Sequence, residues 1–177
     1  MDLGLNSGIY KFLLVLHITC VVVGFGGVAL NGLYGARAKR AGGREGLAIS
    51  ETNFWVAQKA AEPAIYAVFV LGILLVLASN GPGPGGRVWD FDQKWISFAM
   101  LLYIVGIALS HAVLRPAIKK MNALQTELVS GAAAPGAGGA PPQVAELESL
   151  GQRVGAVGAA LNVLLVIIIA LMVWKPL

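Results

Sequence analysis

Charged residues and cysteine are scarce in this sequence. Of its 177 residues only 12% are Asp, Glu, Lys or Arg, whereas 57% are hydrophobic and the mean hydropathy is +0.75. An ordinary soluble domain carries about 25% charged residues. The composition therefore excludes a soluble globular protein and predicts one that has lipid as its main solvent. The single cysteine, Cys20, excludes an intramolecular disulfide and any multi-cysteine zinc or iron-sulfur site.

Several functional signatures are also missing. The net charge of +4 comes from 13 Lys and Arg residues grouped at the ends of apolar runs, which is typical of membrane proteins and not of a nucleic-acid-binding surface. No nucleophile triad, phosphate-binding loop or pair of catalytic carboxylates is present. Gly24, Gly26 and Gly27 lie inside an apolar run, so they do not form a dinucleotide-binding turn. We therefore predict no nucleic-acid partner and no catalytic residue, and the pattern does not favour an enzyme.

Four long apolar runs are present, at about residues 12–34, 60–79, 95–115 and 154–174. Each is close to the roughly 20 residues that a helix needs to cross about 30 Å of hydrocarbon. In lipid the backbone must satisfy its own hydrogen bonds, which favours helices. The predicted fold is an all-α membrane protein, a single four-helix transmembrane bundle over residues 1–177. Its longest connection, 116–153, contains a Gly/Ala/Pro-rich linker at 130–142.

The distribution of basic residues predicts the orientation of the bundle. Nine Lys and Arg residues follow the first and third apolar runs, and four lie elsewhere. By the positive-inside rule, the first and third connections face the cytoplasm and both termini face outward. The expected partners are the lipid bilayer and either other membrane subunits or further copies of the chain.

Small residues predict the packing faces of the helices. In the first run, His17, Cys20, Gly24 and Gly27 follow one another at spacings of three and four, which places them on one stripe. Small residues allow two helices to approach closely in lipid. The glycines expected to serve helix packing are Gly24, Gly27, Gly106, Gly151, Gly155 and Gly158.

Five polar residues fall in the cytoplasmic third of the predicted spans. They are Asn31, Glu62, His111, Arg115 and Asn162. Ionisable groups in hydrocarbon are costly and are usually paired or functional, so we expect Glu62 to lie beside Arg115 or His111. The alternative is that Glu62, which precedes Pro63, only occupies the first turn of a helix, where a carboxylate suits the helix dipole.

The two histidines are candidate ligands of a cofactor. His17 lies in the outer third with Cys20 one turn further on, so it is a candidate site for haem b or for a copper ion held with Cys20. His111 is the second candidate, for a separate site, because an axial offset of about 15 Å prevents both imidazoles from binding one iron. The alternative for each is a histidine hydrogen-bonded to a neighbouring helix.

Short motifs resemble known membrane proteins. The opening Tyr10–His17, the pair Gly26-Gly27, the run Trp95–Pro116 and the ending Leu171–Pro176 resemble a family of small bacterial four-helix integral membrane proteins of unassigned function. More distantly, a first-helix histidine followed by paired glycines is similar to the CopD-type copper-resistance proteins and the HemJ-type protoporphyrinogen oxidases. These resemblances imply a bacterial inner-membrane location and haem or copper at His17. The chain lacks the Tyr-Leu-Pro-Arg sequence of the HemJ pattern.

Three hypotheses for the function follow. The first is an accessory or structural bundle within a membrane complex, which the glycine faces favour. The second is a haem- or copper-associated redox protein that uses His17. The third is a small-solute or proton pathway through the five polar residues of the cytoplasmic third.

Overall fold

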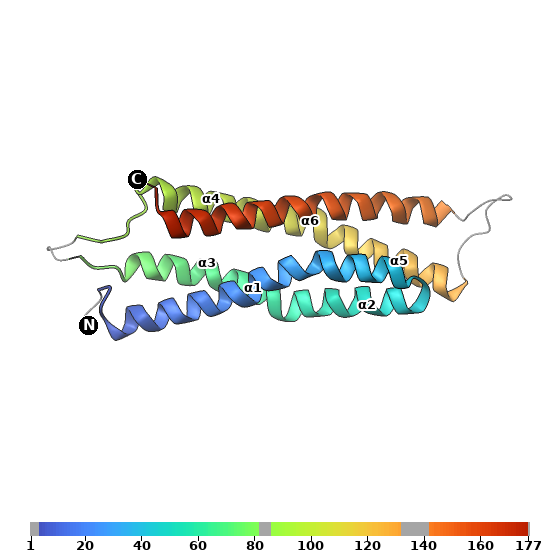
Figure 1. The fold of residues 1–177 in the computed structure, drawn as a ribbon, viewed down its shortest axis with the longest axis horizontal. Helices are drawn as coiled ribbons and strands as arrows, with labels where there is room; N and C mark the ends of the chain where they lie inside the picture. Colours follow the sequence, from blue (N-terminus) through green and yellow to red (C-terminus); the bar gives the residue numbers. More distant parts are fainter. Residues whose placement is uncertain (1–3, 82–85, 132–141, 177) are drawn as a thin grey trace.

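A computed structural model describes residues 4–81, 86–131 and 142–176. In these ranges, four helical segments of 33 to 37 residues are each long and apolar enough to cross a membrane, which confirms the predicted all-α fold. They run side by side as an antiparallel bundle, with the two ends of the chain at the same end of the molecule (Figure 1). Two of the four segments are interrupted by a π turn, written η. The elements are α1 (Gly8–Ala41), α2 (Gly43–Val56), η1 (Ala57–Ala61), α3 (Glu62–Leu77), α4 (Lys94–Leu109), η2 (Ser110–Leu114), α5 (Arg115–Ser130) and α6 (Pro142–Trp174).

The helical segments are longer than the predicted spans. At 1.5 Å per residue they reach about 50 Å, so about 20 Å of the bundle extends beyond the hydrocarbon. This protruding end consists of the turn between α1 and α2 together with α2, α5 and the start of α6. Most of the predicted connection 116–153 is therefore helical, and its predicted linker at 130–142 falls almost wholly outside the described residues.

Polar contacts link the helices of the protruding end. The Ser50 hydroxyl donates to Asn122 Oδ1 at 2.6 Å, which joins α2 to α5. Lys120 and Glu146 form an ion pair that joins α5 to α6. Such contacts are typical of a bundle in water, where hydrophobic burial and surface ion pairs act together.

Glycine allows the chain to reverse between α1 and α2. Gly42 and Gly43 have φ of +64° and +48°, in the left-handed region that side-chain-bearing residues rarely adopt. Three residues further on, a Cβ at Gly46 would lie 2.5 Å from the Ala38 carbonyl oxygen, so only glycine fits the close return of α2 along α1.

Within the membrane portion, α1 packs along α3, α4 packs along α6, and α1 also contacts α6. Among the described helices, α3 and α4 are not a closely packed pair. One residue from each of these four helices forms the central apolar cluster, namely Phe25, Val68, Tyr103 and Ile168. This cluster fills the middle of the bundle.

A second network, which we call the terminal cap, closes the end of the bundle opposite the protruding end. Ser79 is fully buried, and its hydroxyl oxygen accepts a hydrogen bond from the Trp89 amide at 3.1 Å. The Trp89 indole N–H donates to the Tyr10 hydroxyl at 3.1 Å, and Lys175 Nζ lies 4.2 Å from the centre of the Trp89 ring. The terminal cap therefore joins α1, the end of α3, the segment before α4 and the end of α6.

Candidate functional site

Two π turns lie at the same level of the bundle. In η1 the Glu62 N–H donates to the Ala57 carbonyl, and in η2 the Arg115 N–H donates to the Ser110 carbonyl, each five residues back. Each π turn is followed within two residues by a proline, Pro63 or Pro116. Proline lacks an N–H, and its ring clashes with the carbonyl four residues earlier in an α-helix. A wider turn before each proline relieves this clash, and π turns of this kind are frequent at functional sites.

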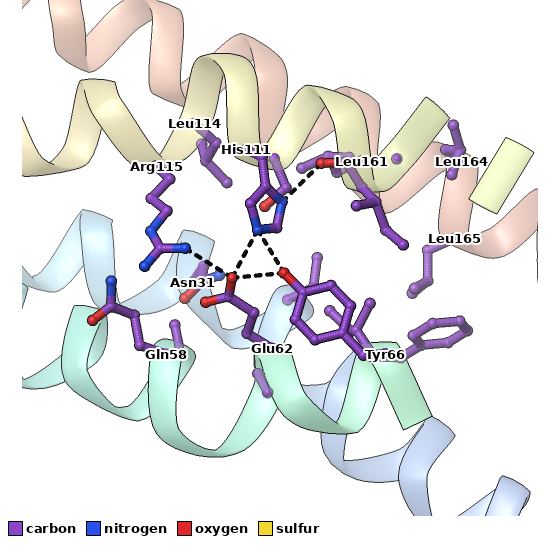
Figure 2. A pocket seen from close by; sticks show the side chains of 18 of the residues that line it. Asn31, Gln58, Glu62, Tyr66, His111, Leu114, Arg115, Leu161, Leu164 and Leu165 are labelled. Atoms are coloured by element: carbon purple, nitrogen blue, oxygen red, sulfur yellow. Dashed lines mark hydrogen bonds and ion pairs between the residues drawn. The ribbon is translucent and has the colours of Figure 1, made fainter. Parts of the chain in front are cut away.

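Glu62 is the centre of a polar cluster at this level. Its Oε1 atom lies 2.9 Å from the Tyr66 hydroxyl, 2.8 Å from His111 Nε2 and 3.0 Å from Arg115 Nη1. Figure 2 shows Glu62 and Tyr66 reaching from one helix towards His111 and Arg115 on the opposite helix. We call these four residues the Glu62 cluster. It joins α3 to the segment formed by α4, η2 and α5.

The contacts of His111 connect it to two other members of the Glu62 cluster. His111 Nδ1 lies 3.0 Å from the Ile107 carbonyl oxygen, which is an acceptor only, so Nδ1 carries a hydrogen. A neutral imidazole then presents a lone pair at Nε2, 2.8 Å from a carboxylate oxygen that also has only lone pairs. His111 Nε2 also lies 2.6 Å from the Tyr66 hydroxyl, so the Tyr66 proton can be donated to Nε2 or to Glu62 Oε1. The Glu62 cluster therefore places a carboxylate, an imidazole and a phenol within hydrogen-bond distance of one another.

A cavity of about 130 Å³ opens beside the Glu62 cluster. Its walls come from all eight helical elements, and most of them are apolar side chains such as Phe25, Ile107 and Leu165. Among the polar groups of the lining, Asn31 and Gln58 lie near the Glu62 cluster (Figure 2). The arrangement offers a small, mainly apolar space with a concentrated polar end.

The structure gathers most of the five polar residues of the predicted cytoplasmic third. Glu62 contacts both of the partners that we expected, His111 and Arg115, and Asn31 lines the cavity. Asn162 is separate, because its amide donates to the Gly158 carbonyl within α6 at 3.0 Å and it does not line the cavity. A role for these residues in function stays a prediction.

Tyr66 was not predicted as a member of the site. It lies four residues after Glu62, so one helical turn places both side chains on the same face of α3. The sequence contains that four-residue spacing. It also contains two charged residues, Glu62 and Arg115, that each directly precede a proline. Periodicity does not reveal a π turn here, however, because the flanking spans are apolar on nearly all faces.

His17 lies elsewhere in the bundle. Its ring packs against Gly72, where Cε1 would be 3.5 Å from a Cβ, and its Nδ1 atom is buried with no hydrogen-bond partner among the described residues. His111 meets α3 at Glu62, ten residues earlier and thus about 15 Å away along the helix. Cys20 packs against the central apolar cluster.

The described residues contain no group of three or more His, Cys, Asp or Glu side chains placed to share a metal ion. The surroundings of His17 therefore do not fit a copper site built from several protein ligands. His17 keeps one imidazole nitrogen without a hydrogen-bond partner in the described residues, which would be the axial contact if haem bound, and haem would supply one-electron chemistry. Haem binding at His17 stays a prediction.

The predicted packing glycines have different surroundings. A Cβ would lie 3.0 Å from Ile65 Cγ1 at Gly24, 2.5 Å from Ala61 Cβ at Gly27 and 3.3 Å from Leu164 Cδ2 at Gly106. At Gly151 the nearest atom is Met121 Cε, at 4.0 Å. At Gly155 and Gly158 a Cβ would meet no described atom within 4 Å. Close packing within the chain therefore involves chiefly the glycines of α1 and α4.

The fold and the site together define a multi-pass α-helical integral membrane protein in contact with the lipid bilayer. Residues 11–176 match the family described as "Predicted integral membrane protein (DUF2269)", and the chain belongs to this family. Comparisons with curated proteins and with solved structures find no match.

Proposed function

We propose that this protein binds a small solute beside the Glu62 cluster and exchanges a proton there, as part of a small-solute or proton pathway across the bacterial inner membrane. The observation that supports the proposal most directly is the close approach of Glu62 Oε1, His111 Nε2 and the Tyr66 hydroxyl, at 2.6 to 2.9 Å from one another. Glutamate and histidine within membrane spans commonly form proton relays. The adjoining cavity gives a solute or water access to these groups.

The pathway is closed on one side in the structure. The central apolar cluster fills the bundle beyond the cavity, so a solute that enters beside the Glu62 cluster cannot pass further without a movement of the helices. The two π turns flank the site and are the natural places for such a movement, because their hydrogen bonds are already rearranged. Passage then requires a second state of the bundle, as in transporters that expose one site alternately to two sides.

Proton flux in proteoliposomes tests the proposal. Vesicles of phosphatidylcholine and phosphatidylglycerol that contain pyranine are given a pH step with and without the protein. We expect faster equilibration with the wild-type protein and a rate near that of empty vesicles with Glu62→Gln, which keeps the shape of the side chain but removes its exchangeable charge. The matched control is Glu51→Gln, because Glu51 is exposed on α2 and does not line the cavity.

Two results would contradict the proposal. Equal flux with wild-type protein and Glu62→Gln would show that the carboxylate takes no part, and wild-type flux no faster than that of empty vesicles would remove the pathway.

A second candidate function is an accessory subunit of a membrane complex, with other membrane subunits or further copies of the chain as partners. The protruding end supports it, because about 20 Å of helical bundle beyond the hydrocarbon presents a folded surface to a partner. Extraction in mild detergent should then give an assembly of fixed composition that persists in Glu62→Gln. A single uniform monomer would contradict this function.

A further inference from the structure

The charge of the Glu62 cluster limits what its cavity can accept. Glu62 and Arg115 pair as opposite charges, and His111 adds a second basic group beside them. Arg115 uses Nη1 to reach Glu62, and its side chain is still 46% exposed. A guanidinium has five N–H donors in a planar fork that suits a carboxylate, so several remain available to a ligand.

The volume of the cavity and its apolar walls limit the size and polarity of the part of the ligand beyond its charged end. A volume of about 130 Å³ is comparable to engineered apolar cavities of about 150 Å³ that hold benzene. Side chains such as Phe25, Ile107 and Leu164 line it. A ligand that fits therefore has one charged or strongly polar end and an apolar body no larger than about a six-membered ring.

The depth of the Glu62 cluster in the membrane favours a ligand that has a charged end. Glu62 begins α3, whose 16 residues reach about 24 Å towards the terminal cap. The cluster thus lies near one boundary of a hydrocarbon layer of about 30 Å, where the desolvation cost of a carboxylate is lower than at the centre.

We propose that the cavity binds a small hydrophobic monocarboxylic acid, with its carboxylate on Arg115 and its apolar body between α1, α4 and α6. The inference rests on the proposed function and names the substrate class of the same site. A weak acid of this kind suits these proton-exchanging groups, because transfer of one proton from the cluster to the bound carboxylate gives an uncharged acid and leaves the cluster with one proton fewer. The acid then leaves towards lipid without carrying a charge.

Benzoate is the probe, and its binding to the detergent-solubilised full chain is measured by isothermal titration calorimetry. Benzyl alcohol and benzylamine serve as neutral and cationic probes of similar size, and inorganic phosphate as an anion without an apolar body. We expect benzoate to bind at least tenfold more tightly than the other three. Arg115→Gln should weaken benzoate binding by tenfold or more, and Arg115→Lys, which keeps the charge without the fork, by less.

Two leucine substitutions on the same helical segment separate the cavity from the lipid-facing surface. Ser110→Leu places a larger side chain in the cavity and should abolish benzoate binding, whereas Ala108→Leu, on the exposed side of α4, should leave it unchanged. Monodisperse elution and an unchanged melting temperature check that each variant is folded. Equal binding of benzyl alcohol and benzoate, equal binding of phosphate, or full binding by Arg115→Gln would overturn the proposal. If benzoate fails to bind while proton flux still depends on Glu62, the substrate class is wrong and the proposed function stands.

Discussion

Glu62 shows how one residue can join two helices. A carboxylate in the membrane portion is costly to desolvate, and here one oxygen atom of that carboxylate receives contacts from three side chains. Tyr66 and Glu62 are on the same helix, whereas His111 and Arg115 come from the opposite segment, which also reaches α3 through the Tyr103 hydroxyl, a donor to the Ile65 carbonyl at 2.8 Å. The Glu62 cluster is therefore a connection between two halves of the bundle as well as a candidate site.

Two adjacent glycines of α1 provide a test of close packing at single residues. Gly27→Ala places a Cβ 2.5 Å from Ala61 Cβ in η1, whereas Gly26→Ala places one in open space. Overpacking of this kind typically costs about 1–3 kcal/mol. We expect Gly27→Ala to lower the melting temperature in detergent and Gly26→Ala to leave it nearly unchanged. A similar melting temperature for the two variants would show that η1 moves away from α1 without cost.

The free imidazole nitrogen of His17 gives a second residue-scale prediction. If His17 is an axial ligand of haem, protein expressed with a haem precursor shows a Soret band, and His17→Ala loses it while still inserting in the membrane. His111→Ala, at the other level of the bundle, should keep the band. An identical spectrum for wild-type protein and His17→Ala removes the redox hypothesis.

At the scale of the elements, the π turns lead to a prediction about variants that lack one residue. A π turn contains one residue more than an α-helical turn, so deleting Ala60 together with Pro63→Ala should restore an α-helix and keep both flanks in register. Deleting Val70, which is also exposed, removes a residue from a regular part of α3 and rotates one flank by about 100° relative to the other. We expect a folded protein from the first variant and an unfolded or aggregated one from the second, measured by circular dichroism and size-exclusion chromatography. Equal loss of structure in the two variants would contradict this account of η1.

Some of these elements could be predicted from the sequence and others could not, for physical reasons. Apolar runs revealed the four segments because lipid requires them to be long and hydrophobic, but the runs gave no information about where polar helices continue into water, as α2 and α5 do. Glu62, His111 and Arg115 could be predicted as neighbours from depth alone, since few charges occur at that level. The placement of Asn162 away from them could not, because depth does not specify which way a helix face points.

At the scale of the whole molecule, the orientation in the membrane remains to be tested. The structure places both ends of the chain at one end of the bundle, and the basic residues predict that this end faces outward. Alkaline phosphatase, which is active only outside the cytoplasm, should therefore be active when fused after Pro176 and inactive when fused after Ser130. The opposite pattern would place the protruding end outside the cell.

The terminal cap also has a consequence for the order of events during synthesis. Tyr10 enters the bilayer first, Trp89 follows two spans later, and Lys175 reaches the Trp89 ring only after α6 has crossed. Since helices insert in the order of their synthesis, the cap closes as one of the last steps of assembly. An open cap would thus mark an unfinished chain, in which Lys175 does not yet cover the Trp89 ring.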